Sequence, residues 1–192
     1  MQYYDDHAFE YSQMTLPINL EEQYTKFLRT IPANGFILDA GCGSGRDAHY
    51  FLEKGYNVDA FDASANLARL AGKLTGLNIR HLRFQDFTPC PIYDGIWGNA
   101  SLLHVPNAEL HDVLVSLKQS LKPGGTFYCS FKYGKQNSTD DAGRKFTNKT
   151  CEALDSDLAN AGFTARRSIT LQHSITPDGI PQDWVAGIAI AP

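Results

Sequence analysis

A glycine-rich segment near residue 40 carries the residue types and spacing best suited to ligand chemistry. It reads DAGCGSG over residues 39–45 and directly follows the short apolar run 36–38. Glycines let the backbone turn sharply and let a ligand approach without meeting a Cβ atom. Backbone N–H groups that open the following helix attract a carboxylate or a phosphate. The segment therefore predicts a ligand-binding loop at the end of a buried strand.

The spacing of the glycines separates the possible ligands. A dinucleotide fingerprint needs G-x-G-x-x-G/A, and counted from Gly41 its last position falls on Arg46. A phosphate-binding P-loop needs a Lys-Ser or Lys-Thr pair that does not follow here. Asp39, just before the loop, would repel a pyrophosphate and suits a ligand with positive charge. A tight strand–helix turn without a ligand is the plainer alternative.

Two further polar positions follow strands of the same predicted sheet. Asp62 ends the second strand, where an acidic residue can accept hydrogen bonds from the hydroxyls of a ribose. Gln85 and Asp86 lie between two phenylalanines after the third strand, so this segment could bind an exocyclic amine and stack a base. Taken singly, Asp62 could be a solvated strand end and the second segment an ordinary turn.

The elements that must position these residues alternate along the chain. Helical spacing predicts helices over residues 20–31, 48–52, 67–74, 107–121 and 154–161, and apolar runs predict strands over 36–38, 58–61, 79–84, 94–98 and 126–131. This alternation predicts an α/β fold with a mostly parallel sheet and helices on both faces. No helix separates the last two β segments, 168–171 and 184–190, so we expect an antiparallel hairpin at one sheet edge.

The composition of the chain limits the number of domains, the kinds of partner and the cellular location that we expect. The chain has 192 residues, of which 43% are hydrophobic and 20% charged, as in one globular domain. The net charge of −4 argues against a nucleic-acid partner. No apolar run approaches the ~18 residues of a membrane helix, and the first residues lack the pattern of a signal peptide. The four cysteines form no Cys-x-x-Cys pair and the six histidines no metal-ligand spacing, so we expect reduced thiols, no metal site and a cytoplasmic location.

Three motifs taken in order resemble one superfamily. The segment DAGCGSGRDAHYFLEKGYNVDAFDAS at 39–64, FQDF at 84–87 and LKPGG at 121–125 are similar to class I S-adenosylmethionine-dependent methyltransferases. Within that superfamily, the first segment resembles a small bacterial branch that includes tellurite-resistance methyltransferases. The resemblance implies a Rossmann-like, doubly wound sheet of seven strands with the last strand antiparallel, and S-adenosyl-L-methionine as the cofactor.

The resemblance also implies which positions hold the cofactor. The glycine loop with Asp39 would hold the methionine half, Asp62 the ribose, Gln85 and Asp86 the adenine, and Asn99 the region beside the amino-acid portion. Tyr11, in an aromatic N-terminal segment, is expected to cover the cofactor. The full expected set is Tyr11, Asp39, Gly41, Cys42, Gly43, Gly45, Asp62, Ala63, Gln85, Asp86, Phe87 and Asn99.

Methyl transfer is an in-line displacement that depends mainly on holding the acceptor in place, and proximity alone can supply roughly 7–11 kcal/mol. A general base is optional. His104, after the fourth strand, is the best candidate for a base or a substrate contact, and a packed histidine bonded to backbone is the alternative. The segment 98–106 lacks the N-P-P-Y pattern of enzymes that methylate DNA bases. Without an appended recognition domain, a small-molecule acceptor is expected.

The organisation expected for this single domain, 1–192, has three parts. Residues 1–34 form a helical N-terminal cap, 35–132 the cofactor-binding core, and 133–192 the substrate-side loops and terminal strands. Two polar segments, 133–146 and 173–183, are expected as loops, and the first is either a lid or disordered. A monomer and a homodimer both remain open. Two other functions also remain open: an NAD-type oxidoreductase and a protein that binds S-adenosylmethionine without catalysis.

Overall fold

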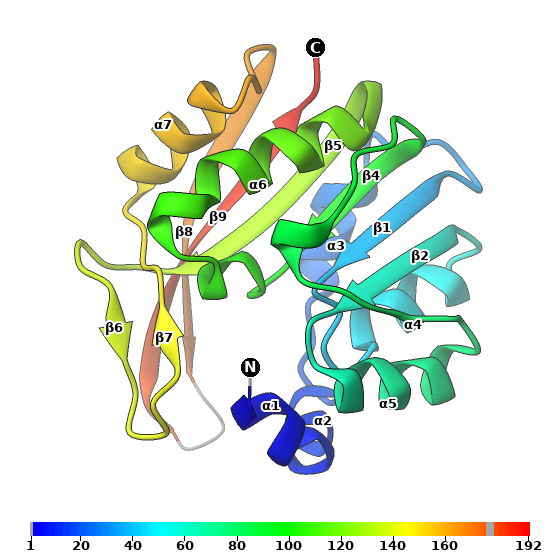
Figure 1. Cartoon of the computed structure of the whole chain (residues 1–192). Coiled ribbons are helices and arrows are strands. Elements are labelled where there is room, and N and C mark those ends of the chain that lie inside the picture. The colour runs from blue at the N-terminus through cyan, green and yellow to red at the C-terminus, as the bar shows by residue number, and fades with distance from the viewer. Residues whose placement is uncertain (1, 176–178) are drawn as a thin grey trace.

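A computed structural model describes residues 2–175 and 179–192, and its centre is a seven-stranded sheet (Figure 1). The strand order is β3-β2-β1-β4-β5-β9-β8. These strands are β1 (Phe36–Ala40), β2 (Asn57–Asp62), β3 (Arg80–His81), β4 (Tyr93–Gly98), β5 (Leu121–Lys132), β8 (Arg166–Ile175) and β9 (Pro181–Ile190).

The direction of the strands confirms the predicted fold class. The strands β1 to β5 pair in parallel, and β9 pairs antiparallel with both β5 and β8. The terminal hairpin therefore lies at the sheet edge, as its lack of an intervening helix predicted. Strand order reverses between β1 and β4, and in such sheets ligands bind beyond the carboxyl ends of the strands at that point.

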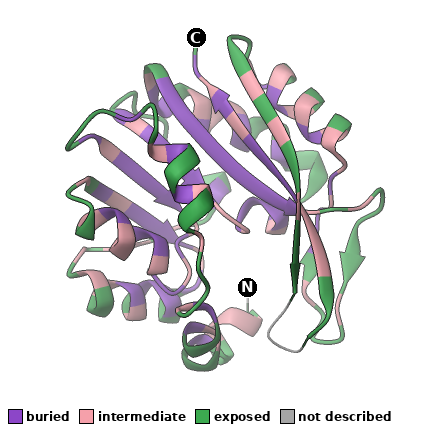
Figure 2. Cartoon of the chain, turned by 180° about the vertical axis from the view of Figure 1, so that it is seen from behind, coloured by how far each residue is buried: buried purple, intermediate pink, exposed green. Residues whose placement is uncertain are grey.

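Alternation along each strand produces the two helical layers. On β1, Ile37 packs with the layer of α3 (Glu21–Leu28) and α4 (Arg46–Glu53), whereas Leu38 packs with α6 (Asn107–Ser120) and α7 (Cys151–Asn160). Helix α5 (Ala65–Thr75) joins the first layer through the contact of Ala71 with Ala60. Figure 2 shows the central strands buried, whereas the edge strand β8 alternates between exposed and intermediate residues.

The first 34 residues divide between two structural roles. Helices α1 (Gln2–Asp6) and α2 (Ala8–Thr15) contact α5 and lie away from the sheet layers (Figure 1). Helix α3 instead buries Tyr24 and Phe27 in the core beneath the sheet. Only α1 and α2 therefore lie where a cap over the strand ends is needed.

Two predicted element boundaries were wrong. The third strand, expected over 79–84, pairs only at Arg80 and His81, and Phe84–Asp86 forms the short 3₁₀ helix η1. This strand is at the sheet edge and pairs with β2 alone, so the chain leaves the ladder when Phe84 turns into the core. Strand β5 begins at Leu121, five residues before the expected start, because the pairing with β4 resumes across a register shift.

Both segments expected as loops contain strands. Residues 133–146 include the small hairpin of β6 (Ser138–Thr139) and β7 (Lys145–Phe146), whose turn is tied by Asp140 to the backbone of Arg144. The second segment, 173–183, is mostly the continuation of β8 and β9. Its residues 176–178 lie outside the described part of the chain. Among the described helices, none is long and apolar enough to cross a bilayer.

Candidate functional site

The glycine loop turns sharply through left-handed backbone conformations. Gly41, Gly43 and Gly45 have φ values of 76°, 54° and 81°. A Cβ atom on Gly41 would lie 2.6 Å from Cβ of Ser101, so the loop packs tightly against the turn after β4. A Cβ atom on Gly43 would meet only Tyr11, at 3.5 Å. Gly43 therefore leaves room for a ligand on the side that faces the N-terminal helices.

Asp62 is tied to this loop by backbone hydrogen bonds. Its Oδ2 accepts from the N–H of Gly43 and its Oδ1 from the N–H of Ser64, each at 2.8 Å. Burial raises the pKa of Asp62, and the two N–H groups partly offset that effect. A carboxylate has about four acceptor positions, so two remain for the hydroxyls of a ligand.

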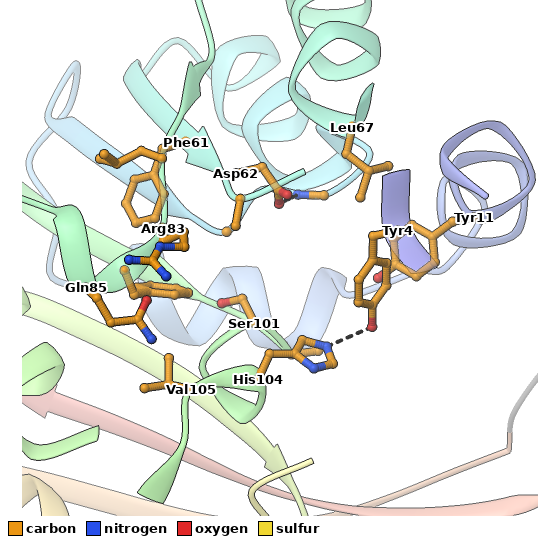
Figure 3. A pocket seen from close by; sticks show the side chains of 16 residues that line it. Tyr4, Tyr11, Phe61, Asp62, Leu67, Arg83, Gln85, Ser101, His104 and Val105 are labelled. Atoms are coloured by element: carbon orange, nitrogen blue, oxygen red, sulfur yellow. Dashed lines mark hydrogen bonds between the residues drawn. The ribbon is translucent and has the colours of Figure 1, made fainter. Parts of the chain in front are cut away.

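A cavity of about 200 Å³ opens beside Asp62, and Figure 3 shows its lining. Apolar side chains from β2, α5 and η1 form one wall, and Gln85 with Ser101 adds polar groups. The lining residues are Tyr4, Tyr11, Gly41, Gly43, Phe61, Asp62, Ala63, Leu67, Leu82, Arg83, Phe84, Gln85, Ala100, Ser101, His104 and Val105. We call this space the first cavity.

A larger cavity of about 640 Å³ lies on the other side of the glycine loop. Its wall comes from the α2–α3 connection, the loop itself, and the ends of β4, β5, β8 and β9. We call it the second cavity. The two cavities share Tyr11, Gly41, Gly43 and Ala100. One ligand over the glycine loop can therefore reach both spaces.

The structure brings eight of the twelve expected binding residues to these walls. Six line the first cavity, and Cys42 and Asn99 line the second. The six are Tyr11, Gly41, Gly43, Asp62, Ala63 and Gln85. Their positions follow from the strand ends and turns that the sequence patterns indicated.

The remaining four lie elsewhere. Gly45 packs on α5, where a Cβ atom would lie 2.8 Å from Cβ of Ala71. Asp86 is exposed and pairs with Arg83, with Nε and Oδ2 2.8 Å apart. Phe87 stacks on Phe61 inside the core, with ring centroids 5.4 Å apart.

Asp39, the fourth of these residues, is buried behind the glycine loop. Only 2% of the residue is exposed, and its Oδ2 has no hydrogen-bond partner among the described residues. Burial and the nearby carboxylate of Asp47 hold the pKa of Asp39 well above its usual range. The orphaned oxygen is a polar group for which a ligand at the loop could supply a partner.

A buried polar network under the second cavity was not anticipated. Asp47 accepts hydrogen bonds from the Tyr24 hydroxyl, from Nε of Arg46 at 2.6 Å and from the Trp97 indole at 2.7 Å. Burial alone would raise the pKa of Asp47, but Arg46 and the hydroxyl and indole donors lower it overall. Arg46 also donates to the carbonyl of Thr15 and lines the second cavity. The signal available in the sequence was an Arg-Asp pair directly after the glycine loop.

Both ring nitrogens of His104 are hydrogen-bonded, so this residue does not have the free nitrogen that a general base needs. Its Nε2 lies 2.7 Å from the Tyr4 hydroxyl and its Nδ1 lies 3.2 Å from the carbonyl of Lys145 (Figure 3). A carbonyl only accepts, so Nδ1 carries the hydrogen and Nε2 accepts from Tyr4. Burial lowers the pKa of His104 to about 4. The neutral ring therefore joins α1 to the β6–β7 hairpin, and neither nitrogen is free to take a proton.

Helix α1 is held from both sides of the first cavity. Oδ1 of Asp5 accepts from Oγ of Ser64 at 2.6 Å and from the N–H of Asn66 at 3.1 Å, at the start of α5. On the opposite side, the Arg144 guanidinium lies over the Tyr3 ring, 4.6 Å from its centroid. Tyr4 contacts His104 between these two points. Helix α1 therefore lies across the first cavity as a strap, and its contacts with the β6–β7 hairpin hold it there.

Comparison with known proteins places this geometry in a family. A model of the methyltransferase domain matches residues 15–170, which include the glycine loop, Asp62 and the sheet up to β8. The chain belongs to this methyltransferase family. The family that the three motifs resembled is thereby confirmed.

Curated relatives of this methyltransferase differ in what their names say they methylate. Malonyl-[acyl-carrier protein] O-methyltransferase of Salmonella typhimurium is 31% identical over 93 residues, which are 46% of this chain and 36% of that protein. Alpha N-terminal protein methyltransferase 1 of Drosophila melanogaster is 28% identical over 163 residues, which are 77% of this chain and 58% of that protein. The chain spans less than two thirds of the length of either relative.

Solved structures share the fold over nearly the whole methyltransferase chain. The 1,6-didemethyltoxoflavin-N1-methyltransferase of Burkholderia thailandensis, solved with 1,6-didemethyltoxoflavin and S-adenosylhomocysteine, has a TM-score of 0.76 and 21% identity. The match covers 100% of this chain and 85% of that one. An S-adenosylmethionine-dependent methyltransferase of Methanosarcina mazei has a TM-score of 0.75 at 17% identity, over 90% of this chain and 98% of that one.

Proposed function

We propose that this protein is an S-adenosylmethionine-dependent methyltransferase that methylates a small-molecule acceptor. The observation that carries the proposal is the meeting of the two cavities over Gly41 and Gly43. A cofactor in the first cavity would reach the second over these glycines, and an acceptor would enter from the other side. The Burkholderia relative, whose structure holds S-adenosylhomocysteine together with a small acceptor, supports this arrangement.

The residues of the first cavity fit the adenosine portion of the cofactor. Asp62 keeps two acceptor positions for the ribose hydroxyls, and Phe61, Leu67 and Phe84 supply apolar surface for the base. Gln85 adds an amide for the exocyclic amine. Tyr11 and helix α1 would cover the cofactor from the N-terminal side.

The groups near the glycine loop fit the charged amino-acid portion. Arg46 lines the second cavity and would attract the carboxylate. Asp39 lies buried behind the loop with its pKa raised, so its carboxyl group would favour an ammonium over a phosphate once a nearby cation shifts it to the ionised form. When bound, S-adenosylmethionine supplies an electrophilic methyl group on a positively charged sulfur. The task of the protein is to hold the acceptor in line with that group and to exclude water.

Two observations support a small acceptor and a cytoplasmic setting. The second cavity, at about 640 Å³, is within the ~300–1,000 Å³ range usual for small-molecule pockets. All four cysteines are free thiols, as expected in a reducing compartment. One domain over residues 1–192, capped by α1 and α2, is the organisation we infer.

Calorimetric titration with S-adenosylhomocysteine tests the cofactor assignment. We expect micromolar binding to the native protein and none to Gly43→Trp, because an indole there would fill the space before Tyr11. Gly124→Trp is the matched control, since Gly124 also has positive φ but has nothing within 4 Å of the added Cβ. No binding by the native protein, or binding of NADH in its place, would refute the proposal. An acceptor screen with a radiolabelled methyl donor then separates an enzyme from a protein that only binds the cofactor.

A further inference from the structure

The side of the second cavity that faces away from the glycine loop is unusually free of charge. We call it the acceptor wall; it comprises the cavity residues of the α2–α3 connection and of the β4, β5, β8 and β9 ends. Within the described chain, these residues include no lysine, arginine, aspartate or glutamate. Trp184, Ile18 and Leu20 contribute apolar surface, and Asn99 and Gln172 contribute amides. A charged acceptor lying against this wall would gain no ionic partner from the wall itself, because Arg46 and Asp47 lie on the opposite, glycine-loop side of the cavity.

Asn99 is oriented as a hydrogen-bond donor toward this space. Oγ of Ser130 donates to Oδ1 of Asn99 at 2.9 Å and accepts from the N–H of Ala100 at 2.8 Å. Ala100 has a φ of 49°, a left-handed conformation that is strained for alanine. This arrangement fixes the carboxamide, and its Nδ2 has no protein partner among the described residues. The wall therefore offers a neutral donor to a neutral acceptor.

A histidine at the solvent-exposed edge of the same wall, with 75% of its side chain exposed, can accept a proton. Nδ1 of His173 lies 2.7 Å from Oδ1 of Asp183, its register partner across the β8–β9 hairpin. A carboxylate only accepts, so Nδ1 carries the hydrogen whenever the ring is neutral. The Nε2 lone pair then has no partner among the described residues. His104 differs, because both of its ring nitrogens are already bonded.

We propose that His173, oriented by Asp183, is the general base for an uncharged acceptor that carries its proton on an O–H or N–H group. The proposal rests on the proposed methyltransferase function. The acceptor proton passes to Nε2 of His173 while the freed lone pair forms a bond to the methyl carbon. The carbon–sulfur bond breaks, and its electron pair stays on sulfur. Asp183 stabilises the imidazolium that results, as a carboxylate does beside a catalytic histidine.

Three naphthalene compounds of similar size test this proposal by calorimetry on protein saturated with S-adenosylhomocysteine. The probes are 2-naphthol, which has an O–H, 2-methoxynaphthalene, which has none, and 2-naphthoate, which is an anion. We expect 2-naphthol to bind at least tenfold more tightly than 2-naphthoate, because the acceptor wall is uncharged. Equal or tighter binding of 2-naphthoate, or binding of none of the three, would overturn the acceptor class.

Substitution of the histidine separates a base from a structural residue. His173→Gln should weaken 2-naphthol binding about fivefold and leave 2-methoxynaphthalene unchanged, because only the naphthol donates to Nε2. Asp183→Asn should give the same pattern. His111→Gln is the matched control, since His111 is an exposed histidine on α6 outside both cavities. Equal weakening of both probes by His173→Gln would identify a structural role and refute the base.

The paired probes supply the readout that a merely structural role would not change, because only 2-naphthol can donate a hydrogen bond to Nε2 of His173. Native protein that fails to bind S-adenosylhomocysteine would refute the methyltransferase function as well. Binding of the cofactor product without these probe preferences would refute the base alone.

Discussion

The hydroxyl of Tyr4 and Nε2 of His104 lie 2.7 Å apart, although 100 residues separate them in the chain. This hydrogen bond fastens helix α1 over the first cavity. Burial beneath this helix lowers the pKa of His104 and keeps the ring neutral. The cap and the β6–β7 hairpin meet at this histidine, because its other ring nitrogen bonds the carbonyl of Lys145.

Removal of the Tyr4 hydroxyl should loosen the cap. A hydrogen bond of this kind contributes about 0.5–1.5 kcal/mol, so we expect Tyr4→Phe to weaken S-adenosylhomocysteine binding by roughly twofold to tenfold in calorimetry. Tyr3→Phe is the control, because Tyr3 contacts Arg144 through its ring rather than its hydroxyl. If Tyr4→Phe binds as tightly as the native protein, the strap does not contribute to cofactor affinity.

His104 should also make stability depend on pH. Its pKa falls from 6.5 in the unfolded chain to about 4 in the folded protein, mainly through burial. Between these values the unfolded state binds a proton that the folded state does not, so the free energy of unfolding decreases as the pH falls from about 6.5 toward 4. The loss should be smaller in His104→Gln.

Thermal unfolding of both proteins at pH 7.5 and pH 5 measures this effect. Asp39 and Asp62 have raised pKa values and act with the opposite sign, because folding favours their protonated forms. They are present in both proteins, so the comparison cancels their contribution. An equal fall in midpoint for native protein and His104→Gln would show that the histidine does not titrate in this way.

Gly45 should contribute to folding more than to ligand binding. A Cβ atom there would lie 2.8 Å from Cβ of Ala71, and the residue has a φ of 81°, which strains any residue other than glycine. Strain and overpacking together predict a loss of about 2–4 kcal/mol for Gly45→Ala in chemical unfolding. Gly76→Ala, with a φ of 74° and nothing within 4 Å, should lose only about 1–2 kcal/mol. A large loss of S-adenosylhomocysteine affinity in folded Gly45→Ala would instead indicate direct contact with the cofactor.

The Asp47 network should be the most sensitive polar cluster in the protein. Asp47→Ala leaves the mostly buried Arg46 without its carboxylate, a change that typically costs about 3–5 kcal/mol. The control is Asp155→Ala, because the pair of Asp155 with Arg167 is more exposed and should contribute less than about 1 kcal/mol. Chemical unfolding of both variants measures the difference. Similar losses would mean that the network is not a major source of stability.

Much of the fold followed from local sequence patterns. Apolar runs located the central strands. Successive side chains of such a strand point to opposite faces of the sheet, and helices cover both faces, so most positions are apolar. Ser64 caps α5, with its Oγ accepting from the N–H of Leu67 at 3.1 Å, and serine is a common residue type at this helix position. The edge strand β3 was less predictable, because its pairing with β2 ends after two residues and long-range packing of Phe84 decides where it stops.

The glycine loop, the acidic end of β2 and the family could be predicted from the sequence, because they depend on backbone conformation and on spacing within one strand–turn–helix unit. The burial of the charged groups and the hydrogen-bond partners of the histidines depend instead on packing between distant segments. Asp39, near the end of β1, is buried behind the loop, whereas Asp86, in η1 after β3, is exposed. His104 is occupied by Tyr4 because α1 folds back across the cavity, and contacts between such distant segments leave no local pattern.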